Sequence, residues 1–313
     1  MNKLKVCFVG IGSIARRHIK NLCDICKDRS VDLVVDALRR KDSVLLQDSE
    51  IANVYTDEKD LPGDYDIIFI TNPTDFHLDV LSALHDKGKH FFIEKPLTSL
   101  KKIEQAENFT CREESIYYVA CPLRYTSVIQ YLKNNIDVNE VLSVRCMSTS
   151  YLPDWRPGID YRQTYSANKE LGGGVSIDLI HEWDYIKYLF GMPEKVLYAS
   201  GKISDLEINC EDYAIYIGTY SNKVVELHLD YFGRKTLREV MLCMKDETII
   251  GDLEKSTVHY LKEDKMISFG EERDDYQRKE LEFFLDLVEG KAKNDNDMKS
   301  AYQTLKLTQG EVE

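Results

Sequence analysis

Two segments of the chain combine residue types that can exchange protons with a bound molecule. The first is FFIEKP, residues 91–96, an apolar run that ends in Glu94, Lys95 and a proline. The second is GGGVSIDLIHEWD, residues 172–184, in which three glycines lead into a stretch that holds Asp178 and His181. A lysine ammonium can polarise an oxygen atom, and histidine is the side chain best suited to move a proton near neutral pH. We therefore take Lys95 and His181 as candidate catalytic residues.

The second segment has helical spacing. On one continuous helix Asp178 and His181 are about 60° apart, Tyr185 lies beside Asp178, and these three form a polar face. The remaining apolar positions form a separate stripe that would pack on a sheet: Val175, Leu179, Trp183, Ile186 and Phe190. We expect Asp178 to orient His181 and Tyr185 to face the substrate. The alternative is that His181 and Asp178 are ordinary polar helix residues.

A glycine turn near the N-terminus predicts a dinucleotide site. The strand-like run Val6–Val9 is followed by Gly10-x-Gly12-x-x-Ala15 and then by helical periodicity from residue 16 to 26. In this context the first glycine permits a tight turn, the second admits a pyrophosphate, and Ala15 allows close helix–sheet packing. Ser13 and Ile14 complete the predicted contact. The alternative is a glycine turn without a ligand.

The second strand offers two conflicting signals for the ribose of the dinucleotide. Asp36 stands at about the expected distance for an acid that binds the 2′-hydroxyl of NAD, but it lies inside the apolar run LVVDAL. Arg39, Arg40 and Lys41 follow at the expected strand end, and arginine suits a 2′-phosphate. We favour NADP through Arg39 and Arg40. If the basic residues are only a solvated loop, Asp36 and NAD remain.

The elements around these residues alternate between apolar strands and helix-length segments up to about residue 120. This pattern predicts a parallel sheet covered on both faces, and ligands of such sheets bind beyond the carboxyl ends of the strands. Thr71, Asn72, Pro73 and His77 follow the strand at 66–71, and Glu94 and Lys95 follow the strand at 90–93, so we assign all six to the cofactor crevice. His77 has the alternative of being a plain loop residue.

Beyond residue 121 alternating runs replace the continuous ones, which favours a largely antiparallel sheet with one face more exposed. We expect runs at 142–147, 196–202, 213–220, 224–231, 239–244 and 248–253, followed by helices at 276–289 and 298–307. The predicted fold is α/β, with a doubly wound Rossmann domain at 1–121 and a second α/β domain with an open, mostly antiparallel sheet at 122–313.

At this point the sequence resembles the Gfo/Idh/MocA family, on the motifs GIGSIA, TNPTDFH, EKP, PLRY at 122–125 and GGGVSIDLIHEWD. The resemblance implies substrates that are sugars, cyclitols or their derivatives, with Lys95 polarising the reacting oxygen. It also implies a homo-oligomer, a dimer or tetramer, because the open sheet face often pairs in this family. Family members of the inositol dehydrogenase type place an aspartate four residues before the histidine, where this chain has Ile177.

The segment 151–170 is similar to family members of sugar-nucleotide metabolism. It gathers aromatic rings and guanidinium groups, which suit stacking and the binding of an anionic group. We assign to the substrate Trp155, Arg156, Tyr161 and Arg162, together with Arg124 of the PLRY motif and Tyr185. A lid or an oligomer contact is the alternative for this segment. The glycines at 172–174 would let the chain pass close to cofactor and substrate.

Composition limits the partners. A net charge of −13 in 313 residues disfavours nucleic acid and anionic lipid, and the N-terminal apolar run is too short for an export signal or a membrane span. We expect a cytoplasmic protein with reduced cysteines, in which Cys23 and Cys26 are helix positions rather than metal ligands. No metal is expected. The predicted function is NAD(P)-dependent oxidation or reduction of a secondary alcohol or ketone. The alternatives are a cofactor sensor without turnover and a reductase of a non-sugar substrate.

Overall fold

A computed structural model describes residues 2–40 and 49–312. The chain forms two compact units. The first unit holds the residues up to Pro122 together with Arg273–Tyr302, and the second holds Leu123–Glu272 and the residues from Gln303 on. The segment 273–302, which we expected in the second domain, therefore belongs to the first unit.

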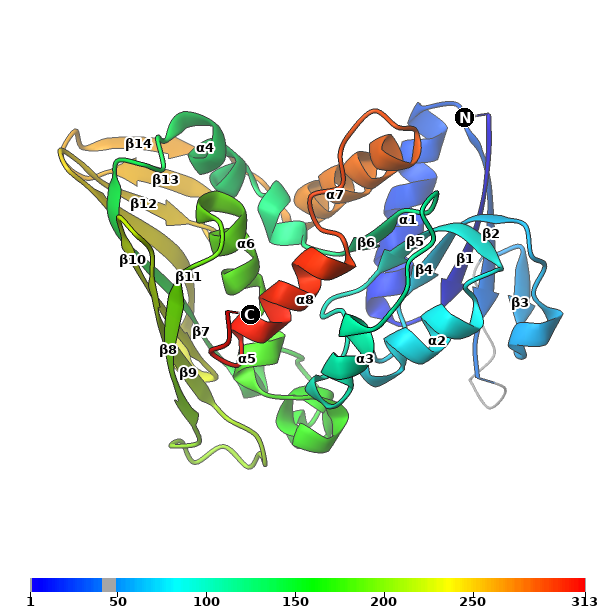
Figure 1. The fold of residues 1–313 in the computed structure, drawn as a ribbon, viewed down its shortest axis with the longest axis horizontal. Coiled ribbons are helices and arrows are strands. Elements are labelled where there is room, and N and C mark those ends of the chain that lie inside the picture. Colours follow the sequence, from blue (N-terminus) through cyan, green and yellow to red (C-terminus); the bar gives the residue numbers. More distant parts are fainter. Residues whose placement is uncertain (1, 41–48, 313) are drawn as a thin grey trace. The chain divides into compact units, whose positions relative to one another are not determined.

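The first unit is built on a six-stranded parallel sheet in the order β3-β2-β1-β4-β5-β6 (Figure 1). Its strands are β1 (Lys3–Val9), β2 (Asp32–Leu38), β3 (Asn53–Tyr55), β4 (Tyr65–Ile70), β5 (Gly88–Ile93) and β6 (Tyr117–Val119). The strand order reverses between β1 and β4, and the crevice outside the carboxyl ends at such a reversal is the place where doubly wound sheets bind ligands. The predicted Rossmann architecture is confirmed.

The helices of this unit are α1 (Ser13–Asp28), α2 (His77–Ala83), α3 (Ile103–Glu107) and α7 (Arg273–Val288), with short 3₁₀ turns at Glu58–Asp60, Thr74–Phe76 and Leu100–Lys102. Helix α7 returns from the second half of the sequence and buries Leu281, Phe284, Leu285 and Leu287, together with the polar Gln277 and Glu280. Phe284 packs edge-on against Phe69 and Phe92 of the sheet. Ion pairs such as Arg29–Asp286 at 3.0 Å fasten α7 to α1.

The second unit is built on an eight-stranded sheet in the order β14-β13-β12-β11-β7-β10-β9-β8. Its strands are β7 (Val141–Tyr151), β8 (Lys195–Gly201), β9 (Tyr213–Thr219), β10 (Val224–Asp230), β11 (Phe232–Met244), β12 (Thr248–Asp252), β13 (Thr257–Tyr260) and β14 (Lys265–Ser268). The one parallel contact joins β7 to β10, and the other pairs are antiparallel. The predicted, mostly antiparallel sheet is confirmed, with two strands more than the sequence indicated, β13 and β14 at one end of the sheet.

The helices of this unit are α4 (Ser127–Asn135), α5 (Val175–Asp178) and α6 (His181–Phe190), with 3₁₀ turns at Pro122–Tyr125, Leu152–Asp154, Tyr161–Gln163, Tyr165–Ala167 and Lys169–Leu171. Helix α8 (Met298–Leu307) begins in the first unit and ends in the second. Trp183 of α6 is fully buried and packs edge-on against Tyr216 of β9, so this member of the predicted apolar stripe lies on the sheet.

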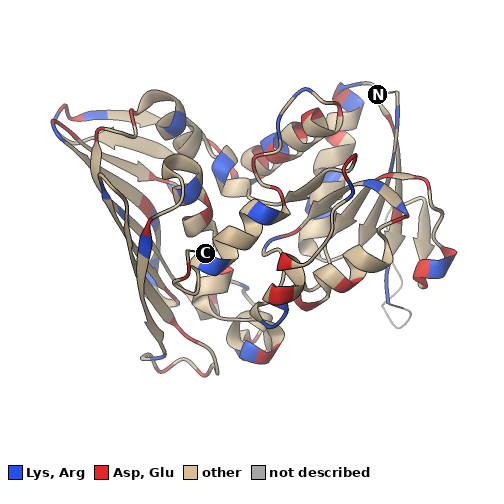
Figure 2. Cartoon of the chain, viewed as in Figure 1, with Lys and Arg blue, Asp and Glu red and all other residues tan. Residues whose placement is uncertain are grey.

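Three further observations bear on the expected partners. Acidic and basic residues are interspersed along both units (Figure 2). No helix among the described residues is long and apolar enough to cross a membrane. All eight cysteines are free thiols, and Cys23 and Cys26 lie within α1 as expected.

Candidate active site

The glycine turn between β1 and α1 has the geometry of an anion site. Gly10 adopts a φ of +83°, and a Cβ there would lie 2.8 Å from the Cα of Asn72. Thr71 fixes the turn from the side, since its Oγ1 donates to the carbonyls of Val9 at 2.9 Å and Gly10 at 2.7 Å. The packing of the protein itself therefore requires glycine at position 10.

Gly12 is a glycine for a different reason. Its backbone is extended, with a φ of −89°, and a Cβ there would meet no atom of the described residues within 4 Å. It is the N-cap of the 16-residue helix α1, which has no side-chain cap and no acidic residue in its first turn. The first N–H groups of such a helix attract a phosphate. Exposed Ser13 and half-buried Ile14 border this open space, and buried Ala15 packs α1 on the sheet. These residues fit a dinucleotide pyrophosphate.

The two candidates for contact with the cofactor's ribose lie in different surroundings. Asp36 lies inside β2 with 1% of its surface exposed, and its carboxylate accepts hydrogen bonds from Asn53 Nδ2 and Tyr65 Oη, both at 2.8 Å. Asp36 is thus engaged in the interior of the unit. Arg39 follows the last residue of β2 and is half-buried, and Arg40 beside it is exposed. Lys41 lies outside the described residues.

Lys95 lies in a turn directly after β5 and is half-buried. Its backbone N–H donates to Glu94 Oε2 at 3.2 Å, and the other oxygen of Glu94 bonds to Nε2 of His18 at 2.5 Å. Burial raises the pKa of Glu94, but the hydrogen bond and charge of His18 and the charges of Lys95 and His77 outweigh it and lower that pKa below its usual value. Glu94 is therefore a carboxylate that supports the turn.

His77 does not reach a cofactor crevice with its side chain, contrary to our expectation. It is 1% exposed, and its ring bridges two backbone carbonyls, with Nδ1 at 3.0 Å from Pro96 O and Nε2 at 2.9 Å from Asn72 O. Burial lowers its pKa, and the carbonyl contacts and Glu94 oppose that change without cancelling it. His77 thus joins the loop after β4 to the turn after β5, while half-buried Asn72 and exposed Pro73 form the surface of that loop.

The three glycines at 172–174 are explained by contacts within the second unit. Gly172 and Gly174 adopt φ values of +85° and +135°. A Cβ on Gly173 would overlap the carbonyl oxygen of Tyr165, and one on Gly174 would overlap the carboxylate of Glu211. Protein backbone and a protein side chain, rather than a ligand, therefore exclude larger residues here.

The helix expected across residues 175–190 is broken. Helix α5 ends at Asp178, Leu179 leaves the helical conformation with ψ +32°, and α6 begins at His181. The 60° relation of Asp178 to His181 therefore does not apply. Asp178 is buried and its Oδ2 accepts from Tyr231 Oη at 2.6 Å, and His181 is half-buried at the first position of α6.

Tyr185 is not part of a polar face with Asp178. It is fully buried, and its hydroxyl lies 2.8 Å from Cys146 Sγ of β7. The break at Leu179 turns this side of α6 toward the sheet. Tyr185 therefore packs the core of the second unit instead of facing a substrate.

The residues assigned to the substrate divide into two groups. Arg124 is 2% exposed and forms a bidentate pair with Asp184 through Nε at 2.8 Å and Nη2 at 2.7 Å. Arg162 is exposed but forms ion pairs with Asp160 at 2.9 Å and Glu207 at 3.2 Å. Both guanidinium groups are thus already paired with carboxylates of the second unit.

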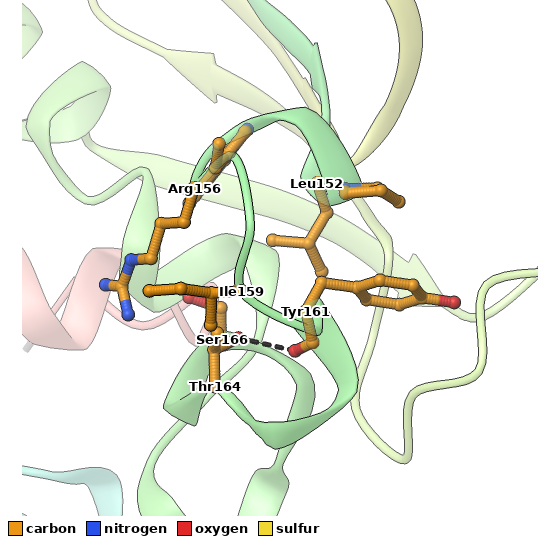
Figure 3. A pocket seen from close by; sticks show the side chains of 8 residues that line it. Leu152, Arg156, Ile159, Tyr161, Thr164 and Ser166 are labelled. Carbon is orange, nitrogen blue, oxygen red and sulfur yellow. Dashed lines mark hydrogen bonds between the residues drawn. The ribbon is translucent and has the colours of Figure 1, made fainter.

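Trp155, Arg156 and Tyr161 instead line a small pocket with Leu152, Pro153, Ile159, Thr164 and Ser166 (Figure 3). Thr164 Oγ1 donates to the carbonyl of Tyr161 at 2.6 Å and closes the loop around it. The indole of Trp155 donates to Ser150 Oγ at 2.8 Å, and Arg156 lies 5.5 Å from the ring centre of Tyr165. Arg156 is exposed and is the member of this group that could meet an anionic ligand.

Sequence reasoning missed His18 and Tyr231. His18 follows Ile14 by four residues and precedes Leu22 by four, so its place on the buried stripe of α1 was the available signal. Tyr231 carries no such signal, because its contact with Asp178 joins segments far apart in the sequence. Among residues 2–40 and 49–312 no group of three His, Cys, Asp or Glu side chains is arranged to hold a metal ion.

Two models of one family match the chain. Residues 4–120 match the model described as "Oxidoreductase family, NAD-binding Rossmann fold", and residues 129–236 match "GFO/IDH/MocA C-terminal domain". Among curated proteins, the uncharacterized oxidoreductase YrbE of Bacillus subtilis is 25% identical over 222 residues, and myo-inositol 2-dehydrogenase of Thermotoga maritima is 21% identical over 204 residues. These alignments cover 68% and 64% of this chain but only 63% and 59% of the relatives.

Solved structures share the fold. Levoglucosan dehydrogenase in complex with NADH and levoglucosan has a TM-score of 0.79 at 15% identity, covering 98% of this chain and 96% of that one. UDP-N-acetylglucosamine 3-dehydrogenase from Acidithiobacillus ferrooxidans has a TM-score of 0.76 at 18% identity, covering 99% of this chain and 97% of that one. With both domain models matched in order and the predicted motifs present, the chain belongs to the Gfo/Idh/MocA family of oxidoreductases.

Proposed function

We propose that this protein is a nicotinamide-dependent dehydrogenase or reductase that acts on a secondary alcohol or ketone of a sugar, a cyclitol or a sugar derivative. The observation that carries the proposal is Gly12, which lies at the open start of α1 and where a Cβ would meet no atom of residues 2–40 and 49–312 within 4 Å. When bound, the nicotinamide supplies or accepts the hydride. The names of the relatives, inositol and levoglucosan dehydrogenases, support a polyol or sugar substrate.

Residues of the chain bind the cofactor and move the proton. The N–H groups that follow Gly12 hold the pyrophosphate. Lys95 donates a hydrogen bond to the reacting oxygen and stabilises negative charge as the alcohol loses its proton. His181 takes that proton in oxidation and returns it in reduction. Asp178, bonded to Tyr231, has a supporting role in the second unit.

We propose NADP as the preferred cofactor, bound through Arg39 and Arg40. The carboxylate of Asp36 is engaged by Asn53 and Tyr65, which leaves Arg39 as the charged residue next to the end of β2. A guanidinium pairs with a 2′-phosphate in a way that a ribose hydroxyl cannot reproduce. We further propose a homo-oligomer, a dimer or tetramer, as the family resemblance implies. We also propose a cytoplasmic location, on the N-terminal sequence and the scattered cysteines.

The cofactor is tested by thermal shift with NADP and NAD at equal concentrations, because stabilisation grows with ligand concentration divided by Kd. We expect NADP to raise the Tm more. Arg39→Ala should weaken NADP binding about 10- to 100-fold, as expected for loss of a charged hydrogen bond of about 1.5–3 kcal/mol, with little change for NAD. A greater stabilisation by NAD would contradict the assignment of Arg39.

The activity is tested by the absorbance of reduced nicotinamide across polyols, sugars and sugar nucleotides, with the wild type, Lys95→Ala and His181→Ala. Turnover by the wild type that both variants lose supports the proposal. Cofactor binding without turnover on the whole panel favours the alternative of a cofactor sensor.

A further inference from the structure

We propose that His18 and His77 are positioning residues that hold the Lys95 turn from its two sides. Lys95 lies between Glu94 and Pro96, and each of these neighbours bonds to one of the two histidines. The consequence for catalysis rests on the proposed role of Lys95. The contacts themselves do not depend on that role.

The first support comes from α1. His18 Nε2 donates to Glu94 Oε1 at 2.5 Å, and Glu94 Oε2 accepts from the backbone N–H of Lys95 at 3.2 Å. One carboxylate thus connects the helix that begins at Gly12 with the backbone of Lys95. Any displacement of Glu94 removes an acceptor from the Lys95 backbone.

The second support comes from the loop after β4. His77 Nδ1 lies 3.0 Å from the carbonyl oxygen of Pro96, and Nε2 lies 2.9 Å from that of Asn72. A neutral ring carries one proton, and the proposal assigns it to Nδ1, which then donates to Pro96. The backbone of Asn72 is also the surface against which Gly10 packs. His77 therefore connects the glycine turn, through Asn72, with the residue that follows Lys95.

Both histidines are buried, where a ring nitrogen without a hydrogen-bond partner is costly. Each histidine is 1% exposed, and the ring of His18 lies edge-on to Phe92 at 5.1 Å. Nδ1 of His18 is buried and has no hydrogen-bond partner among the described residues. A leucine would fill this apolar position without desolvating two ring nitrogens. The bond to Glu94 is the contact that accounts for a histidine here.

The wild-type protein gives a first test through the tautomers of the two rings. Long-range ¹H–¹⁵N spectra of protein labelled at histidine report which ring nitrogen carries the proton. We expect a proton on Nε2 of His18 and on Nδ1 of His77. A ring of His18 with the proton on Nδ1 alone, or of His77 with the proton on Nε2 alone, would overturn the proposal.

Matched variants give the second test, since the amide nitrogen of asparagine lies near the position of Nδ1 and that of glutamine near Nε2. His18→Gln and His77→Asn keep the proposed donors, whereas His18→Asn and His77→Gln remove them. A merely structural role predicts that all four lower the stability of the unit without this crossed pattern. A positioning role predicts that the second pair disturbs Lys95 and the first pair largely rescues it.

The probe is Lys95 itself, observed as a ¹³C-dimethylated lysine and identified by the signal that Lys95→Arg lacks. In folded His18→Asn and His77→Gln we expect its signal to shift or broaden, while Lys87 and Lys89 of the same unit, which bond to Leu61 and Asp66, stay unchanged. An unchanged Lys95 signal in these variants, or an equal change in all four, would overturn the proposal.

These measurements need no turnover, so they remain decisive if no substrate is found and the proposed activity fails. Where a substrate is known, His77→Gln should lower kcat about 10²-fold, the usual effect of misplacing a catalytic group by about 1 Å. The Kd for NADPH should not change. A loss confined to KM would show that His77 acts on binding and not through Lys95.

Discussion

Gly12→Ala separates a glycine required by a ligand from one required by the protein. The φ of −89° at Gly12 is accessible to alanine, and in the part of the chain that the structure describes the added methyl would meet no atom within 4 Å. The change should therefore leave the free energy of unfolding within about 0.5 kcal/mol of the wild type, or raise it slightly by restricting the unfolded chain. The same methyl would occupy the space proposed for the pyrophosphate.

The expected loss of affinity follows from overpacking. An extra methyl forced into a close contact costs about 1–3 kcal/mol, which corresponds to an increase in Kd of about 5- to 150-fold. Gly10→Ala is the matched control. Its Cβ would lie 2.8 Å from a backbone atom of Asn72 at a φ of +83°, so it should lower stability even without cofactor, by about 1–3 kcal/mol for the backbone conformation alone.

Differential scanning fluorimetry without ligand measures stability, and titration of NADPH fluorescence measures the affinity for the cofactor. Gly12→Ala should change the affinity for NADPH and not the stability, and Gly10→Ala should change both. If Gly12→Ala binds NADPH as tightly as the wild type, the pyrophosphate does not lie over Gly12. The observation that carries the proposed function would then be lost.

Three further changes test buried contacts described above, each within one unit. Arg124→Ala should destabilise the protein by about 3–5 kcal/mol, because it leaves the buried carboxylate of Asp184 uncompensated; denaturant unfolding measures this, and a loss below 1 kcal/mol would contradict the buried pair. Tyr65→Phe should lower the free energy of unfolding by about 1–3 kcal/mol, because it removes a donor from buried Asp36. The ratio of NADP to NAD affinity should stay constant, and a changed ratio would indicate that Asp36 contacts the cofactor. Burial lowers the pKa of His77, so below the ordinary pKa of histidine the unfolded chain binds a proton that the folded chain does not, and stability should fall as the pH drops through that range. His77→Asn should therefore make the Tm depend less on pH between about pH 7 and pH 5. A Tm of His77→Asn that falls with pH as steeply as that of the wild type would refute the lowered pKa of His77.

The sequence predicted the elements that local patterns determine. Continuous apolar runs gave the strands around Phe69 and Phe92, and the glycine turn appeared where its spacing placed it. Strands β13 and β14, at one end of the sheet, were missed because they are only four residues long, and the edge strand β14 has no fully buried side chain. Short edge strands depend on pairing with a neighbour more than on their own residues.

The candidate site was less predictable because its contacts join distant segments. The helical pattern from Val175 to Phe190 is real, yet it could not reveal the break at Leu179, where the chain leaves the helical conformation after a four-residue first helix. Arg124 and Arg162 had the right chemistry for an anion, but whether a guanidinium is already paired depends on tertiary structure. Residue type identified candidates, and only packing could distinguish the available ones from the engaged ones.

The return of α7 to the first unit has a consequence for how the protein is made. The ribosome releases β1 to β6 early, but the helix that covers Phe69 and Phe92 with Phe284 and fastens to α1 is synthesised only after the whole eight-stranded sheet. At usual translation rates of about 5–20 residues per second, the first unit must wait on the order of ten seconds with an apolar face uncovered. The last step of its folding therefore follows synthesis of the eight-stranded sheet, and truncation before Arg273 would leave that face exposed to aggregation.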